Sequence, residues 1–259
     1  MHKVTHSMRP IGGLGNQMFQ VACAIGYSIK HGHSPVFNLL KSEHEKSLDY
    51  AEHCFHNLPK GFVENASTVT EEEDGLYRNT QLFNSNVSFY GYFQSPRYFV
   101  DEDYIAQLLS CSTEDEKDIR KRYADMLKKN TVSIHVRRGD FLSPLTYPDW
   151  QPTVPVEYYE KCLSMVKHDM ILCFSDDIEW CRRNLNFKNL FFVEGNPSWK
   201  DLFLMSLCNN NIMANSTFSW WAAFLNKNKN KRIIFPSKWF GKKCKYKTND
   251  MFPTSWESA

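Results

Sequence analysis

The second half of the chain alternates short apolar runs with stretches of helical periodicity. The apolar runs predict strands at 131–136, 170–174, 190–193, 211–214 and 232–236. Helical patterns fall between them, the clearest at 156–167, after the cap at 198–201, and on the face that contains Phe218, Trp221, Ala222 and Leu225. Such β/α alternation is typical of a parallel, doubly wound sheet. We therefore predict an α/β fold with a Rossmann-like C-terminal domain.

The first half gives weaker signals, although we expect it to be α/β as well. An apolar face recurs from Met18 to Ile29 and predicts a helix that stops at Gly32. Residues 34–89 show little periodicity. A polar stretch at 128–130 is the predicted boundary between an N-terminal lobe, 1–129, and a C-terminal lobe, 130–259.

The predicted strand at 131–136 carries the most informative chemistry. Alternation puts His135 and Arg137 on the face opposite Ile134. Arg138 and Asp140 follow at the carboxyl end, where open α/β sheets bind their ligands. An arginine fork matches the oxygens of a phosphate two at a time. A charged surface turn is the alternative, and an adhesive Arg-Gly-Asp motif fits nothing else in the chain.

Two further stretches resemble anion sites. The first is a glycine-rich turn that enters a helix and contains Gly13, Gly15, Asn16 and Gln17. It matches neither the dinucleotide fingerprint nor a P-loop, so a tight structural turn is the alternative. The second follows the strand at 211–214 and contains Asn215, Ser216, Thr217 and Ser219.

Asp176 and Asp177 end another predicted strand. They can cap the helix that follows, or accept hydrogen bonds from the ring N–H and amine of guanine.

The composition of the chain limits which kinds of binding partner are expected. With 31 basic and 29 acidic residues, no global charge favours nucleic acid. Nine Lys or Arg and no acid between 227 and 247 suggest either a solvated surface or peripheral contact with anionic lipid. The chain shows no secretory h-region and no membrane-spanning run, which favours a soluble, cytoplasmic protein with reduced cysteines.

The sequence predicts no metal site. The histidines at 31, 33, 53 and 56 lack completing ligands. Asp101 and Asp103 form a D-x-D pattern, but they open a helix, where acids favour the helix dipole.

Taken together, the motifs resemble one family, the α-1,2-fucosyltransferases in their soluble bacterial-type form. The resemblance is carried in order by G-G-L-G-N-Q-M-F-Q (12–20), G-Y-F-Q-S-P-R-Y-F (91–99), H-V-R-R-G-D-F (135–141), F-S-D-D (174–177) with Trp180 and Cys181, D-L-F-L-M-S-L-C (201–208), A-N-S-T-F-S-W-W-A-A (214–223) and P-S-K-W-F (236–240). The family is similar in its nucleotide site to α-1,6- and protein O-fucosyltransferases.

The resemblance implies a two-lobed, GT-B-like enzyme that transfers fucose from GDP-β-L-fucose to a terminal galactoside. Transfer would invert the anomeric centre without a metal or other cofactor, and the N-terminal lobe would face the acceptor. Arg137 would grip the β-phosphate, with Arg138 in support. Asp176 or Asp177 would read guanine. The glycine loop would face the diphosphate, and Ser216, Thr217 and Ser219 would donate hydrogen bonds to it, beside Asn215.

The resemblance leaves the identity of the catalytic base open. The α-1,6 relatives carry a glutamate after the arginine motif, but residues 141–145 contain no acid. Asp140 is the nearest candidate and His135 the next. Asp140 can equally orient Arg137, and the departing phosphate can itself take the proton. Another GDP-hexose donor, or a lectin-like protein on the same fold, is the alternative function.

Overall fold

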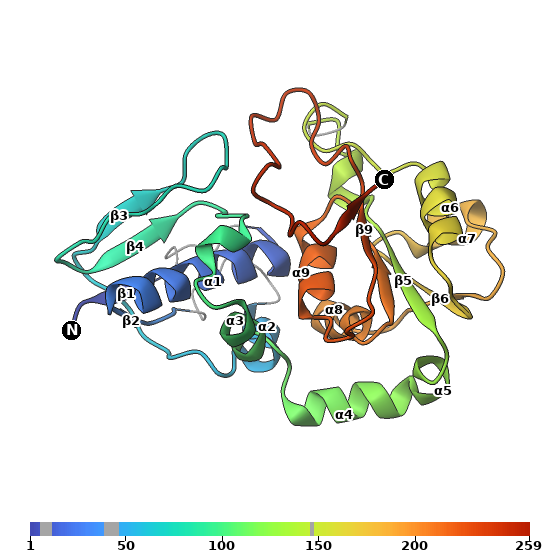
Figure 1. Ribbon diagram of the computed structural model, residues 1–259, viewed down its shortest axis with the longest axis horizontal. Helices are drawn as coiled ribbons and strands as arrows, with labels where there is room; N and C mark the ends of the chain where they lie inside the picture. The colour runs from blue at the N-terminus through green and yellow to red at the C-terminus, as the bar shows by residue number, and fades with distance from the viewer. Residues whose placement is uncertain (6–11, 39–46, 146–147) are drawn as a thin grey trace. The chain divides into compact units, whose positions relative to one another are not determined.

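The computed structural model describes residues 1–5, 12–38, 47–145 and 148–259 (Figure 1). The chain divides into two compact units. The first contains Met1–Ser112 and Lys245–Pro253, and the second contains Thr113–Cys244 and Thr254–Ala259. This division falls before the boundary at 129/130 expected from the sequence, and it assigns a short segment near the C-terminus to the first unit.

The first unit has a four-stranded parallel sheet in the order β2-β1-β4-β3. The strands are β1 (Lys3–Thr5), β2 (Ser34–Pro35), β3 (Ser67–Thr70) and β4 (Val87–Tyr90). The helices are α1 (Leu14–His31), α2 (Ser47–His53), the 3₁₀ turn η2 (Pro96–Tyr98) and α3 (Glu102–Leu108). Helix α1 is the long buried helix that the sequence predicts, and it ends at Gly32.

The second unit has a six-stranded parallel sheet in the order β10-β9-β8-β5-β6-β7. Its strands are β5 (Thr131–Val136), β6 (Met170–Ser175), β7 (Leu190–Phe192), β8 (Asn210–Ile212), β9 (Ile233–Phe235) and β10 (Glu257–Ser258). Counted from β5, this is the Rossmann order 3-2-1-4-5-6, which reverses direction between β5 and β8. The predicted doubly wound α/β fold is therefore confirmed.

Helices cover both faces of this sheet. Figure 1 shows α6 (Val156–Met165) and α7 (Ile178–Asn184) on one face, and α8 (Ser198–Ser206) and α9 (Thr217–Leu225) on the other. The second unit also contains α4 (Thr113–Arg122), α5 (Ala124–Leu127) and the 3₁₀ turn η3 (Gly139–Leu142).

The predicted alternation along β5 decides which core each side chain enters. Val132, Ile134 and Val136 pack into the apolar core beneath α6. On the other face, Asn211 donates to Ser133 Oγ at 2.8 Å, and Asn226 donates to Asn211 Oδ1 at 2.7 Å. The second face is thus a buried polar network, in which each amide depends on its partners.

No helix within the described ranges is long and apolar enough to cross a membrane.

Candidate active site

The two predicted arginines follow β5 directly, at the edge where the strand order reverses. All six residues of β5 are buried, and the strand pairs with β6 on one side and β8 on the other. Arg137 and Arg138 are the first residues beyond it. Ligands of doubly wound sheets bind at this kind of edge, so the fold puts both guanidiniums where a ligand is expected.

Arg137 is held between two carboxylates. Its Nη2 donates to Asp140 Oδ1 at 2.5 Å, and its Nη1 lies 2.7 Å from Asp176 Oδ2. The guanidinium also lies 5.5 Å from the ring centroid of Phe141. The side chain keeps 32% of its surface exposed. Arg137 is therefore oriented by three neighbours while one side remains open to a ligand.

Arg138 is held by a different set of contacts. Its Nε donates to Asp177 Oδ2 at 3.2 Å, and its guanidinium lies 3.9 Å from the ring centroid of Trp180. Its backbone N–H donates to Asp176 Oδ1 at 2.9 Å. The aromatic face and the carboxylate together fix the plane of this guanidinium. Trp180 is a site residue that sequence reasoning placed only in a motif. The sequence signal that could have identified Trp180 is its place in the first turn of the helix that Asp177 caps, close to the end of the strand.

Both aspartates predicted to read guanine already have partners. Asp176 bridges the two arginines, because one oxygen accepts from the Arg138 backbone and the other pairs with Arg137. Asp177 is the N-cap of α7 and accepts from the Trp180 N–H at 3.1 Å, so it does cap this helix, while its recognition of guanine stays a prediction. The close approach of the two strand ends also needs Gly139, since a Cβ there would lie 2.6 Å from Asp176 Oδ2.

His135 lies apart from the ion pairs of this cluster, on the face of β5 opposite the apolar core. Its side chain is buried under α9, 5.4 Å from the Phe218 ring, and its Nδ1 has no hydrogen-bond partner among the described residues. Burial, with a smaller effect of the Arg137 charge, lowers the pKa of His135 to about 3. The imidazole is therefore neutral at ordinary pH and largely buried, and the role of His135 as a base stays a prediction. Asp140 is accessible, but it is paired with Arg137.

The polar residues at the end of β8, Asn215, Ser216, Thr217 and Ser219, divide into two groups. Asn215 is buried and donates to the carbonyls of Pro152 and Trp239, at 2.8 and 2.9 Å. Ser219 is also buried, and its hydroxyl donates to the Ser216 carbonyl at 3.2 Å. These two residues hold the local loops together. Ser216, the N-cap of α9, and Thr217 are only partly buried.

The glycine-rich turn lies in the first unit. Gly13 is the N-cap of α1 and provides no side-chain cap, which leaves the first turn of the helix suited to an anion. Asn16 and Gln17 turn back onto the unit itself. Asn16 Oδ1 accepts from Gln94 Nε2 at 3.0 Å, and Gln17 Nε2 donates to the Gly12 carbonyl at 3.2 Å. Gly15 is buried. The diphosphate-binding role of the loop stays a prediction.

The remaining charged motifs have local partners. In the described ranges, no group of three or more His, Cys, Asp or Glu residues could hold a metal ion. Asp101 caps α3 and accepts from the Tyr104 N–H at 2.9 Å, as the helix-opening alternative predicts. Within the basic stretch 227–247, ion pairs join Arg232, Lys243 and Lys245 to acids. These pairs reduce the positive charge available for a membrane surface, and membrane contact stays a prediction.

The fold defines a class, the GT-B-like glycosyltransferases. The α-1,6-fucosyltransferase NodZ, co-crystallised with GDP, superposes with a TM-score of 0.58 over 87% of this chain and 93% of NodZ, at 13% identity. A variant of Arabidopsis thaliana FUT1 in complex with GDP gives a TM-score of 0.56 over 90% of this chain and 70% of that chain, at 10% identity. At such identities the likeness concerns the fold.

Sequence relatives define the family within this class. The model of glycosyl transferase family 11 matches residues 70–258, and the chain belongs to this family. The Escherichia coli alpha-1,2-colitosyltransferase is 28% identical over 96% of both chains. The Escherichia coli O-antigen biosynthesis glycosyltransferase WbnK is 38% identical over 43% of this chain, and that match spans 39% of WbnK. A galactoside 2-alpha-L-fucosyltransferase of Caenorhabditis elegans is 23% identical over 95% of this chain and 76% of its own length.

Proposed function

We propose that this protein transfers L-fucose from GDP-β-L-fucose to the 2-hydroxyl of a galactoside and forms an α-1,2 linkage. The observation that carries the proposal is the pair Arg137 and Arg138, which Asp140, Asp176 and Asp177 orient at the carboxyl end of β5. Membership of family 11 and the α-1,2 activity named for two relatives support the linkage.

The reaction needs positive charge at the leaving group. As the bond between the fucose anomeric carbon and the β-phosphate oxygen breaks, negative charge grows on GDP and the sugar acquires oxocarbenium character. Donors already aimed at the diphosphate stabilise that state more than the ground state. We assign the β-phosphate to Arg137, whose exposed side faces outward from the cluster, and a supporting contact to Arg138. The hydroxyls of Ser216 and Thr217, across the reversal point on α9, are proposed as further donors.

Guanine recognition is proposed for Asp177. Its two oxygens each accept one hydrogen bond in the cluster, and a carboxylate oxygen can accept a second. The ring N–H and exocyclic amine of guanine match these remaining acceptor positions. Asp176 is assigned to orientation of the arginines, because it contacts both of them.

The acceptor proton is assigned to the released GDP. His135 is buried, and Asp140 is engaged with Arg137. When the acceptor oxygen bonds to the anomeric carbon, its proton passes to a phosphate oxygen of GDP, so no protein carboxylate changes its protonation state. The reaction inverts the β-linked donor to an α-linked product. We propose that it needs no metal ion, since arginines supply the charge at the diphosphate.

The test is incubation of the full chain with GDP-fucose and a panel of terminal galactosides, followed by mass and linkage analysis. An α-1,2-fucosylated product supports the proposal. Glycan binding that GDP does not affect, without turnover, would instead identify a lectin-like protein. EDTA is included, and an activity that EDTA abolishes and Mn²⁺ restores would contradict the metal-free mechanism.

Colitose is a second candidate for the transferred sugar, because the Escherichia coli alpha-1,2-colitosyltransferase matches the chain over nearly its full length. Colitose lacks the 3-hydroxyl of fucose. A site that hydrogen-bonds this hydroxyl rejects the deoxy sugar strongly, whereas a site without that contact does not. The same assay with GDP-colitose as competing donor distinguishes the two sugars by the ratio of their kcat/KM values.

A further inference from the structure

A cavity of defined chemistry lies within the first unit. It has a volume of about 270 Å³ and lies between the C-terminal half of α1, the loop after β3 and the turn η2. Side chains from these three elements line it, chiefly Tyr27, Lys30, Tyr77, Arg78, Arg97 and Tyr98. This volume suits a single sugar ring better than a longer oligosaccharide.

The lining of this cavity is cationic. Lys30, Arg78 and Arg97 all line it, and no Asp or Glu is among the lining residues. Lys30 lies in the last turn of α1, where its charge also balances the negative end of the helix dipole. Within the lining itself, the positive charge of these three side chains meets no acidic side chain.

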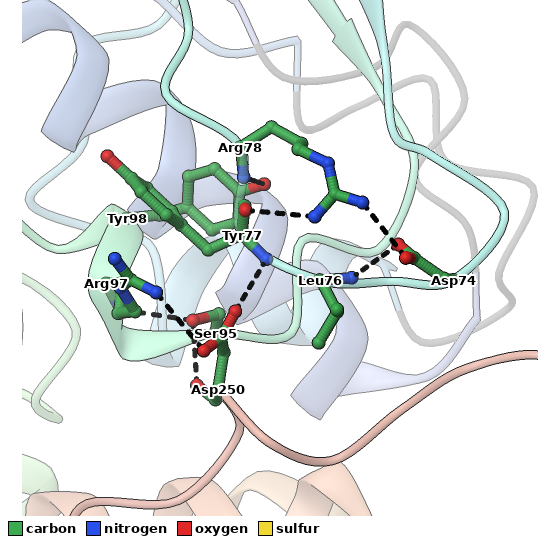
Figure 2. Close-up of polar contacts among 8 residues, drawn as sticks. All are labelled: Asp74, Leu76, Tyr77, Arg78, Ser95, Arg97, Tyr98 and Asp250. Carbon is green, nitrogen blue, oxygen red and sulfur yellow. Dashed lines mark hydrogen bonds and ion pairs between the residues drawn. The ribbon is translucent and has the colours of Figure 1, made fainter.

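Carboxylates outside the lining hold the arginines in place. Asp74 pairs with Arg78 at 2.9 Å, and Asp250 pairs with Arg97 at 3.2 Å. Figure 2 shows Asp250 joined to the loop and to the turn, because it also accepts from the Tyr77 N–H at 3.1 Å. The Nε and Nη2 groups of Arg97 have no partner within the described part of the chain. Arg97 thus keeps donors for a ligand while one carboxylate orients it.

Aromatic rings provide a second kind of contact. The Tyr77 and Tyr98 rings lie 4.8 Å apart at 58°, and Arg97 lies 4.5 Å from the Tyr77 centroid. Burial raises the pKa of Tyr98, so its hydroxyl stays protonated at all ordinary pH values. Aromatic faces pack against the C–H faces of sugars, whereas an inorganic anion has no apolar surface to pack against them.

The walls of the cavity are fixed before any ligand binds. The Tyr98 hydroxyl accepts from the Arg78 N–H at 3.1 Å, and the Tyr27 hydroxyl accepts from the Phe83 N–H at 3.0 Å. A Cβ at Gly26 would lie 1.9 Å from the Tyr98 carbonyl oxygen, so α1 and η2 are in backbone contact. A pre-formed wall lowers the entropy cost of binding.

We propose that this cavity binds a pyranose that carries an anionic group, a phosphate or a carboxylate, and that this sugar belongs to the acceptor. The arginines would pair with the anion while the tyrosine rings pack on the sugar. The assignment to the acceptor rests on the proposed transferase function. The recognition of a charged sugar rests only on the cavity.

Calorimetric titration of the full chain, saturated with GDP, tests the proposal. The ligands are galactose 6-phosphate, galacturonic acid, galactose and inorganic phosphate. We expect the phosphorylated or the acidic sugar to bind at least tenfold more tightly than galactose and than phosphate alone. The stronger of the two identifies the anion. Equal affinity for galactose, equal affinity for free phosphate, or no binding of either charged sugar would overturn the proposal.

Variants locate the site. Arg97→Gln keeps an amide donor for Asp250, and Arg78→Gln changes an exposed side chain on the loop. Each should weaken binding of the charged sugar at least tenfold. Lys60→Gln is the matched control, since it removes an exposed cation of the same unit outside the cavity, and it should change the affinity by less than twofold. Unaltered affinity in both arginine variants would place binding elsewhere and overturn the assignment.

Two further measurements distinguish a misfolded variant from a lost binding site, and failure of this proposal from failure of the proposed transferase function. The melting temperature of each variant shows whether the unit is intact. GDP affinity is measured separately on the same proteins, and we expect both arginine variants to retain it. If the wild-type chain does not bind GDP, that result counts against the proposed transferase function. If it binds GDP but no charged sugar, that result counts only against the proposed role of the cavity.

Discussion

Arg137 Nη1 lies 2.7 Å from Asp176 Oδ2, so an acid at the end of β6 fixes the arginine at the end of β5. The second oxygen of the same carboxylate accepts from the Arg138 backbone. One aspartate thereby couples both arginines to the neighbouring strand, and its removal should disturb the whole cluster.

Asp176→Asn tests this coupling. The amide can accept from only one of the two arginines, and its NH₂ group cannot pair with a guanidinium. A hydrogen bond to a charged group contributes about 1.5 to 3 kcal/mol, so we expect kcat/KM for the nucleotide sugar to fall roughly 10- to 100-fold. Asp118→Asn, which removes an exposed acid paired with Lys200, is the control. Equal kinetics for the two variants would mean that Asp176 does not position the site.

Asp140→Asn separates orientation from proton abstraction. The asparagine oxygen can still accept from Arg137, so an orienting role predicts a loss in kcat of at most about tenfold, with an unchanged pH profile. If Asp140 were the base, kcat would fall by at least about 10² and the acidic limb of the pH–rate profile would disappear. The measurement is kcat against pH for the variant and the wild type.

Asp201 makes stability depend on pH. Burial raises the pKa of this carboxyl to about 7. The hydrogen bond from Asn196 Nδ2, 2.8 Å long, lowers this pKa by a smaller amount. Between the ordinary pKa near 3.8 and about 7, the unfolded chain releases this proton and the folded chain keeps it. The contribution of Asp201 to stability is thus fully present below the ordinary pKa, is lost as pH rises to about 7, and changes no further above it.

Asp201→Asn should remove this dependence. The asparagine can still accept from Asn196 but does not titrate. We expect the variant to melt at a higher temperature than the wild type at pH 8, with the difference shrinking towards pH 4. Thermal unfolding at several pH values measures it. A constant difference across that range would show that Asp201 titrates normally.

Asn211→Ala tests the polar network beneath α8 and α9. Asn211 is buried, donates to Ser133 Oγ and to the Met205 carbonyl, both at 2.8 Å, and accepts from Asn226. Its loss leaves several buried groups unpaired, and we expect the free energy of unfolding to fall by about 2 to 4 kcal/mol in urea titration. Asn184→Ala, at an exposed position on α7, should cost less than about 1 kcal/mol. Similar losses for the two variants would refute the network's role.

The α/β alternation of the second unit could be predicted because each strand is a distinct apolar run. Strand order could not, since the pairing of β5 with both β6 and β8 depends on contacts between distant segments. In the first unit, β3 and β4 were missed because each is four residues long and flanked by irregular chain. Strand β1, of three residues, gave no periodic signal either.

In the candidate site too, local sequence patterns could be predicted, whereas contacts between distant segments could not. Polar residues that follow apolar runs predicted the positions of Arg137 and Asp176, because carboxyl ends of parallel strands share one edge. Their pairing depends on the register of β5 against β6, which aligns Val136 with Ser175 and is not visible in the sequence. Alternation correctly put His135 on the face opposite Ile134, but the burial of the His135 ring against Phe218 could not be foreseen.

The most direct test of the account is kcat for Arg137→Ala, measured at saturating nucleotide sugar with the donor that the wild type uses. Loss of one donor that stabilises the charge on the leaving diphosphate predicts a fall of roughly 10² to 10³ or more. Arg137→Lys, which keeps the charge and loses the fork, should fall between alanine and wild type. A kcat of Arg137→Ala within about threefold of the wild type would contradict the claim that this arginine stabilises the departing GDP.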